Sequence, residues 1–175
     1  MSHHQKILYP TGNKDENYTP DYAVRAIVPY LPTGLVYWCP FDTDESHFVK
    51  VMRDSNLKVI NSHIFNGQDF YTHEPSERWD CIVSNPPFTN KSLIFQRALS
   101  FGKPFALLMT LTWLNDAAPK RIFSGRQLEL LMFEERIQYL GHEIDRVTFS
   151  SAYYCSGLLP KPIMFDSLKK YGMGK

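Results

Sequence analysis

The residues with the clearest chemical potential are Asn85-Pro86-Pro87-Phe88, which directly follow the apolar run 81–84. Two prolines restrict the backbone and offer carbonyl oxygens without competing N–H groups, so this loop is stiff. The side-chain oxygen of Asn85 and the carbonyl of Pro86 could together accept both hydrogens of a planar amino group, with Phe88 stacked on the ring that bears it. The alternative is a plain turn, in which the prolines end a strand and Phe88 packs in the core.

Asn-Pro-Pro-Phe after a strand resembles the catalytic motif of the S-adenosylmethionine-dependent N6-adenine DNA methyltransferases, and other amino-methyltransferases share it. The resemblance implies that Asn85, Pro86, Pro87 and Phe88 are catalytic and that S-adenosylmethionine is the cofactor. Accepting two hydrogen bonds would draw the lone pair of the exocyclic nitrogen out of ring conjugation and aim it at the sulfonium methyl group. The expected reaction is methyl transfer to an exocyclic amino nitrogen, with adenine N6 in DNA as the favoured target.

Two further segments resemble the same family, in the same order along the chain. Tyr18-Thr19-Pro20 is similar to the N-terminal element that helps bind the methionine end of the cofactor. Residues 67–70 (Gly-Gln-Asp-Phe) are similar to the segment that contacts its adenine. A carboxylate such as Asp69 can accept a hydrogen bond from the adenine N6, and Phe70 can stack on or flank the ring. The alternative for this pair is a turn acid beside a core aromatic residue.

The loop at residues 39–46 follows the first predicted strand and contains no glycine, whereas the family has a Gly-rich loop at this place. Pro40 and Phe41 resemble the Pro-Phe pair found in this loop among adenine methyltransferases. Asp42 and Ser46 could supply polar contacts instead of glycine N–H groups, with Asp42 on the ammonium group of the cofactor. The alternative for both is helix capping and complementation of the helix dipole.

Composition and charge restrict the class of protein. A chain of 175 residues that is 43 % hydrophobic fits one globular domain. We therefore expect an irregular arm over residues 1–17 and a single methyltransferase-like domain over residues 18–175. With 19 basic and 18 acidic residues the net charge is +1, so a polyanion must be held by a local patch.

The sequence also carries expectations about location and metals. Three well-separated cysteines fit reduced thiols better than disulfides. The chain lacks a long apolar stretch and the pattern of a signal peptide, which predicts a cytoplasmic protein without membrane association. The histidines lack the paired spacing of metal ligands, so no metal is expected.

Short apolar runs alternate with helical stripes along the chain. Strands are expected at residues 35–39, 57–60, 80–84, 105–109, 137–140 and 162–165. Helices are expected at residues 19–32, 48–52, 92–101 and 127–135. This alternation predicts an α/β protein with a mostly parallel sheet covered by helices on both faces, which is the Rossmann-like fold of class I methyltransferases. Residues 60–69 leave hardly any room for the usual helix and third strand, so the sheet should be abbreviated.

The remaining strands and helices use up the residues after the Asn-Pro-Pro-Phe motif, so we expect no target-recognition domain. This organisation is similar to that of small phage-encoded adenine methyltransferase-like proteins. Residues 110–115 follow a predicted strand at the edge that holds the motif, and they could contact a substrate. Lys120, Arg121 and Arg126 come soon after them and could bind phosphates, or they could form a solvated helix face. The aromatic run 149–155 could stack on unpaired bases or pack in the core. Target choice should be weak or depend on self-association or a partner.

Two other functions stay open. Methyltransferases that act on RNA bases or on a glutamine amide in a protein also use Asn-Pro-Pro-aromatic loops. A catalytically degenerate module that keeps the fold for binding is favoured by the glycine-free loop. It is also favoured by Asn61-Ser62-His63, which stand where the family carries the acid that holds the ribose.

Overall fold

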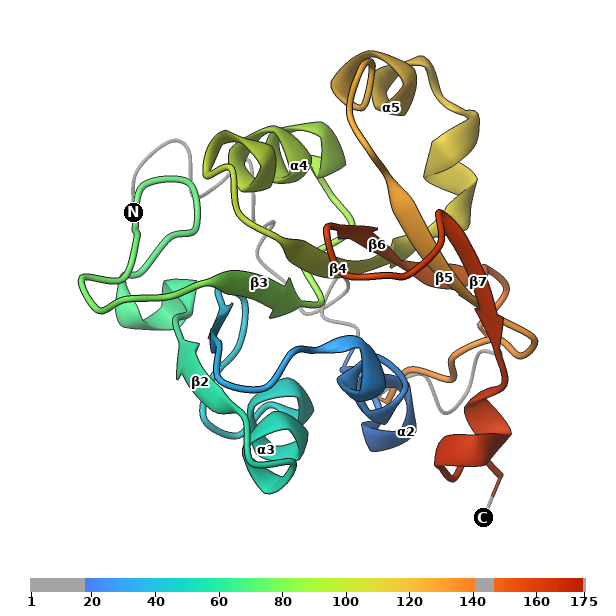
Figure 1. Cartoon of the computed structure of the whole chain (residues 1–175), viewed down its shortest axis with the longest axis horizontal. Coiled ribbons are helices and arrows are strands. Elements are labelled where there is room, and N and C mark those ends of the chain that lie inside the picture. Colours follow the sequence, from blue (N-terminus) through green and yellow to red (C-terminus); the bar gives the residue numbers. More distant parts are fainter. Residues whose placement is uncertain (1–17, 141–146, 175) are drawn as a thin grey trace.

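A central sheet organises the chain. This computed structural model describes residues 18–140 and 147–174, and the arm expected over residues 1–17 lies outside them. The strands are β1 (Val36–Cys39), β2 (Lys58–Asn61), β3 (Cys81–Ser84), β4 (Phe105–Thr110), β5 (Glu129–Phe133), β6 (Ser151–Ser156) and β7 (Ile163–Asp166). They lie in the order β2-β1-β3-β4-β6-β5-β7 (Figure 1).

The sheet is mostly parallel, as the sequence predicts. β1, β2, β3 and β4 run parallel, β6 is antiparallel to both β4 and β5, and β7 is parallel to β5. β2 forms one edge, and the stretch between β2 and β3 holds the short 3-10 helix η2 (Ile64–Asn66). The expected shortening of the sheet at this edge is therefore confirmed. The four parallel strands bring the ends of β1, β3 and β4 to the same edge.

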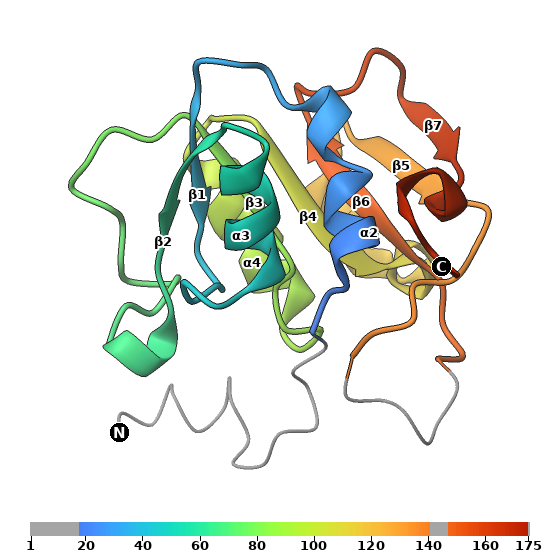
Figure 2. The same cartoon turned by 90° about the horizontal axis from the view of Figure 1, so that it is seen from below.

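Helices cover both faces of the sheet (Figures 1 and 2). They are α2 (Asp21–Arg25), α3 (His47–Asp54), α4 (Lys91–Ser100) and α5 (Ala117–Ile122), with 3-10 helices η1 (Val28–Tyr30), η3 (Leu111–Asn115) and η4 (Leu168–Tyr171). The apolar side chains of α2 and α3 belong to one core cluster, and those of α4 belong to a second, together with Trp113 of η3. The two clusters lie on opposite faces of the sheet because successive residues of a strand point to opposite sides. Ala106 and Leu108 of β4 join the first cluster, and Leu107 and Met109 join the second.

Two expectations for the C-terminal half are wrong. The stretch 127–135 contains the strand β5 (Glu129–Phe133) rather than a helix, and residues 137–140 contribute only an isolated bridge between Leu140 and Tyr18. Leucine, methionine and glutamate favour helices, but β5 lies between β6 and β7, and pairing on both sides outweighs that preference. Ile137 and Tyr139 do alternate inward, as in a strand, but among the described residues only the bridge at Leu140 pairs this stretch.

The aromatic run 149–155 serves the core rather than the surface. Residues 151–155 lie in β6 and are all buried, and the Tyr153 hydroxyl donates to the carbonyl oxygen of Ala23 at 3.0 Å. The Tyr154 hydroxyl donates to the carbonyl oxygen of Thr110 at 2.8 Å. β6 thus ties β4 to α2, and its tyrosines are unavailable for stacking on a base.

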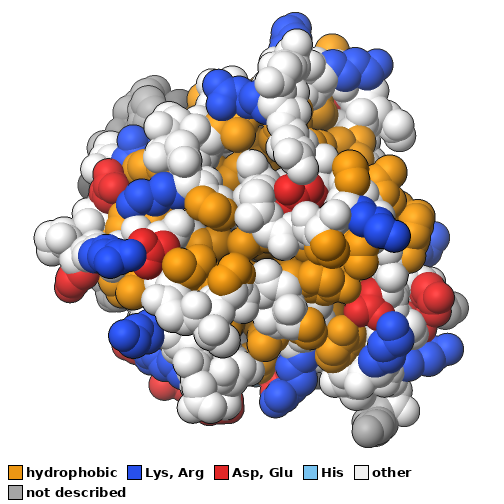
Figure 3. Space-filling model, viewed as in Figure 1, with side chains coloured by type: hydrophobic (Ala, Val, Ile, Leu, Met, Phe, Trp, Pro, Cys, Tyr) orange, Lys and Arg blue, Asp and Glu red, His pale blue; other side chains and the backbone are white. Residues whose placement is uncertain are grey.

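Figure 3 shows hydrophobic side chains gathered across the middle of one face, with Lys and Arg side chains around the rim. Cys39, Cys81 and Cys155 are buried free thiols, and burial raises the pKa of each. No helix within residues 18–140 and 147–174 has the length and apolar character needed to cross a membrane.

Candidate active site

Asn85 occupies the first position after β3, at the edge where the parallel strands end. Its side-chain Nδ2 donates a hydrogen bond to Oγ1 of Thr19 at 3.0 Å. Thr19 is buried and directly precedes Pro20 and α2. The start of α2 lies near the sheet edge at which β3 ends (Figure 2). The two segments that the sequence assigns to catalysis and to the methionine end of the cofactor are therefore in direct contact. Tyr18, next to Thr19, is 60 % exposed.

Asp42 lies beside this position, in the loop that follows β1. Its carboxylate is only 6 % exposed and accepts a hydrogen bond from the hydroxyl of Ser84, the residue before Asn85. Burial raises the pKa of Asp42 to about 7, although hydrogen bonds from Ser84 and Ser46 oppose this shift. Burial thus moves the pKa of this carboxyl group from its ordinary value of 3.8 toward neutral pH.

The rest of the glycine-free loop is held by its own polar groups. The Ser46 hydroxyl accepts a hydrogen bond from the backbone N–H of Thr43 at 3.0 Å, and Pro40 is buried. Ser46 thus stabilises the turn before α3 and also faces Asp42. The backbone N–H of Asp42 donates to the carbonyl oxygen of Ser62 at 3.2 Å, which fastens the loop to the end of β2.

Phe41 and Phe70 form an aromatic surface at the same edge. Their ring centroids are 4.8 Å apart, and Phe70 packs in turn on Trp38 of β1 at 5.6 Å. Phe70 is 1 % exposed, whereas Phe41 is half-buried, so Phe41 is the ring that a ligand can reach. Asp69 has one carboxylate oxygen, Oδ1, engaged by the backbone N–H of Tyr71 at 3.0 Å, which closes the turn. These contacts match the alternative of a turn acid beside a core aromatic residue, and the role of Asp69 and Phe70 at the cofactor's adenine stays a prediction.

Pro86, Pro87 and Phe88 continue the loop that begins at Asn85. Pro86 is buried and Pro87 half-buried. Phe88 meets Tyr139 and Phe149 edge to face, with centroids 6.0 and 5.6 Å away. Aromatic pairs of this geometry hold a ring firmly. The Phe88 ring is therefore fixed by partners far along the chain, which the local sequence did not indicate.

Residues 61–63, at the end of β2, stand where the family has an acid, and here Asn61 and Ser62 stabilise the loop that follows β1. Asn61 accepts from Arg53 Nη2 at 3.1 Å and donates to the backbone carbonyl oxygen of Asp42 at 3.3 Å. The buried Ser62 hydroxyl accepts from the indole N–H of Trp38 at 2.9 Å. His63 Nδ1 accepts from the backbone N–H of Phe65 at 3.1 Å. In the sequence, only the short polar run after the expected strand 57–60 indicated that these residues make such contacts.

Comparisons with known proteins agree with this architecture. No protein-family model matches the sequence, and no curated protein matches it. Among solved structures, a type I restriction-modification system methyltransferase subunit from Streptococcus thermophilus aligns with a TM-score of 0.56 and 10 % identity, over 91 % of this chain and 49 % of that one. A putative class I S-adenosylmethionine-dependent methyltransferase from Listeria monocytogenes aligns with a TM-score of 0.54 and 9 % identity, over 96 % of this chain and 71 % of that one.

The fold of this chain is the class I methyltransferase fold. The chain spans about half of the length of the Streptococcus thermophilus subunit. In this fold, ligands bind at the carboxyl ends of the parallel strands, which is where Asp42 and Asn85 lie. Among the residues that the structure describes, no group of three His, Cys, Asp or Glu side chains is placed to hold a metal ion.

Proposed function

We propose that this chain is an S-adenosylmethionine-dependent methyltransferase that acts on an exocyclic amino nitrogen, with adenine N6 in DNA as the substrate. The observation that carries the proposal is the position of Asn85: it follows β3 at the ligand-binding edge, and Thr19 holds its amide. A fold alone does not assign a function, so the proposal depends on the residues at the carboxyl edge of the sheet. One structural neighbour is a restriction-modification methyltransferase subunit, and this favours DNA over other substrates.

The residues at the edge suit the proposed cofactor. Asp42 would receive the ammonium group, Thr19 and Pro20 would border the methionine end, and Phe41 would cover the adenine. When bound, S-adenosylmethionine supplies an electrophilic methyl group. The chain provides no Gly-rich cradle, so side chains rather than glycine N–H groups must make these contacts.

In the proposed mechanism the chain positions the nucleophile. The Asn85 side-chain oxygen and the Pro86 carbonyl would accept the two hydrogens of the target amino group and hold its nitrogen in line with the methyl group. Phe88, fixed by Tyr139 and Phe149, would stack on the target base. In a duplex the base must first be flipped out, at a cost of a few kcal/mol, and stacking on Phe88 would offset part of it. Proton loss from the nitrogen follows methyl transfer, so the site needs no strong base.

Calorimetry with S-adenosylhomocysteine, followed by transfer of a labelled methyl group to adenine-containing DNA, tests the proposal. We expect saturable heat at one site and label that enzymatic digestion recovers as N6-methyladenine. Label in RNA or in a glutamine amide instead would reassign the substrate. The absence of both heat and label would leave the fold as a binding module without catalysis.

Asp69 offers a sharper test of the cofactor's orientation. The substitution Asp69→Asn keeps an acceptor oxygen for the Tyr71 N–H but places an NH2 group where the second carboxylate oxygen would accept from the adenine N6. We expect S-adenosylhomocysteine to bind about 1–3 kcal/mol more weakly, because a buried hydrogen bond is lost. Calorimetry measures the change, and Glu74→Gln, the same change at an exposed carboxylate nearby, is the control. Unchanged affinity would remove Asp69 from the adenine site.

How the enzyme chooses targets is part of the same proposal. Because a net charge of +1 allows few phosphate contacts, we propose that the chain methylates with little sequence preference, or that self-association or a partner selects its sites. Mapping methylated adenines after reaction with genomic DNA checks this. A long, strictly defined recognition sequence produced by the isolated monomer would contradict it.

A further inference from the structure

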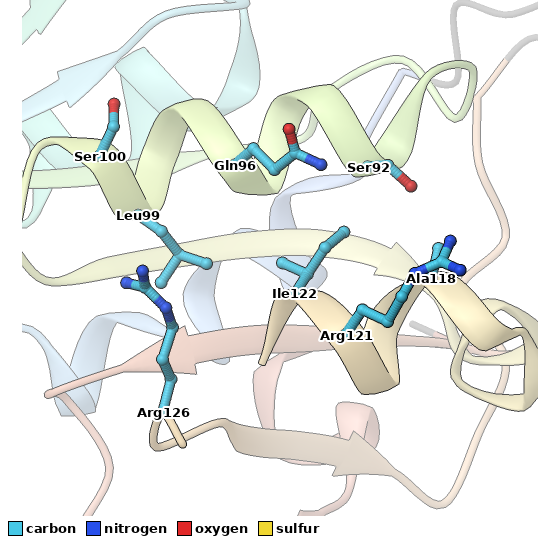
Figure 4. A pocket seen from close by; sticks show the side chains of 8 residues that line it. All are labelled: Ser92, Gln96, Leu99, Ser100, Ala118, Arg121, Ile122 and Arg126. Carbon is cyan, nitrogen blue, oxygen red and sulfur yellow. The ribbon is translucent and has the colours of Figure 1, made fainter. Parts of the chain in front are cut away.

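A groove lies between α4 and α5, on the face of the sheet opposite α2 and α3 (Figure 4). Its volume is about 400 Å³, within the range of about 300–1,000 Å³ that is typical of ligand sites. Leu99 and Ile122 contribute apolar surface. The polar residues along the α4 side are Ser92, Gln96 and Ser100. We call this cavity the α4–α5 groove.

Two arginines give the groove its charge. Arg121 lies in the last turn of α5, and Arg126 follows that helix and extends toward Leu99 of α4 (Figure 4). Arg121 and Arg126 are both exposed. Within residues 18–140 and 147–174, neither guanidinium forms an ion pair with a carboxylate. In the described part of the chain, the groove therefore presents two guanidinium groups without an ion-pair partner beside apolar side chains.

The groove continues toward the Asn85 loop. A second cavity of about 290 Å³ shares Ser92 with it and is also lined by Asn90 and Lys91, which follow Phe88 closely in sequence. Lys91 and Asp116 both line this second cavity, so their charges balance there. Arg121 lies at the Ser92 end of the α4–α5 groove and Arg126 at its Leu99 end (Figure 4), so the Arg121 end is the one that continues toward the candidate catalytic loop.

We propose that the α4–α5 groove holds a single-stranded stretch of nucleic acid next to the target base, with Arg121 and Arg126 on its phosphates. This rests on the proposed function for the class of substrate, and it adds where the substrate backbone lies. A chain with a net charge of +1 needs a local patch to hold a polyanion, and the guanidinium group matches phosphate geometry. Apolar side chains between two cations suit a base whose phosphates lie on either side. An unpaired strand can turn a base toward the apolar side chains while its phosphates contact the arginines, whereas the bases of a duplex are paired and stacked, so the unpaired strand is the better occupant.

The test measures binding rather than catalysis. Fluorescence anisotropy follows a labelled single-stranded oligodeoxynucleotide of about 12 nucleotides, a length within the range of known single-strand sites. It compares the full chain with the double variant Arg121→Gln/Arg126→Gln at several salt concentrations. The matched control is Lys58→Gln/Lys161→Gln, which removes the same charge from two exposed positions outside the groove. Thermal unfolding of each variant checks the fold.

We expect the arginine variant to bind about tenfold more weakly, with the slope of log affinity against log salt smaller by about 1.4, because two phosphate contacts are lost on a single strand. The control should change the slope little. Equal losses in the two variants, or no binding by the unaltered chain, would overturn the proposal. So would a probe that binds only as a duplex, or displacement by an acidic peptide as effective as by unlabelled oligonucleotide. These outcomes do not depend on S-adenosylhomocysteine binding, so failure of the proposed function is recognised separately.

Discussion

Replacing Asn85 by alanine is expected to lower the rate of methyl transfer about 100–1,000-fold, because one preorganised acceptor for the substrate amino group is removed. Asn85 is a half-buried loop residue outside both hydrophobic clusters, so the fold should persist. Transfer of a labelled methyl group to DNA, compared at saturating cofactor, measures the loss. Asn66→Ala, the same change at an exposed asparagine after β2, is the matched control. Equal rates for the Asn85 variant and the unaltered chain would exclude Asn85 from the mechanism.

Thr19 provides a second variant at the same position. Thr19→Val keeps the shape of the side chain and removes the oxygen that receives the Asn85 Nδ2–H. If Thr19 positions Asn85, turnover should fall several-fold while the apparent affinity for DNA changes little, since about 0.5–1.5 kcal/mol of hydrogen bonding is lost. Thr19→Ser should restore turnover because it restores the hydroxyl.

Asp42 is expected to make the stability of the protein depend on pH between about 4 and 7. Its folded-state pKa of about 7 exceeds the ordinary value of 3.8, so the native protein retains a proton that the unfolded chain has lost. The stabilising contribution is complete below about pH 4 and disappears as the pH rises through 7. A shift of about three pKa units corresponds to about 4 kcal/mol.

The variant Asp42→Asn isolates this effect because it keeps the shape of the side chain without a titrating group. Urea unfolding at pH 4 to 8 measures the free energy of unfolding of both proteins. As the pH rises, this free energy should increase in the variant relative to the unaltered protein, by about 4 kcal/mol at pH 8. Asp54→Asn, at an exposed carboxylate on α3, controls for the loss of one negative charge. A constant difference across the pH range would show that Asp42 is ionised throughout.

The N-terminal half of the fold could be predicted because its elements are marked locally. β1 and β3 are short apolar runs that end at Pro40 and at Asn85-Pro86, and α4 begins and ends within one residue of its expected bounds. β5 could not be predicted in this way. Glu129, only 1 % exposed, accepts hydrogen bonds from the backbone N–H groups of Gly157, Leu158 and Leu159. A partner more than 25 residues away therefore fixes the start of β5.

The candidate site could likewise be predicted from the sequence only where local motifs mark its residues. The sequence motifs named Asn85 and Thr19 as candidate site residues, and the hydrogen bond between them was found only in the structure. The contacts that set the chemistry of the site join distant residues: Ser84 with Asp42, and Phe88 with Phe149. Local sequence patterns carry no information on such pairs. The same holds for Phe70, whose place under Phe41 follows from the way the chain packs on Trp38.

The strand order has a consequence for how this chain folds during synthesis. β1, β2, β3 and β4 are contiguous in the sheet and complete before β5 is made, so the edge that carries Asp42 and Asn85 can form early. β5 follows, yet the strand that joins it to the sheet, β6, is translated later. Until β6 inserts between β4 and β5, the apolar residues 130–133 have no place in the sheet. A nascent chain stalled between β5 and β6 would therefore expose this segment, and chaperone binding or aggregation should be greatest at that length.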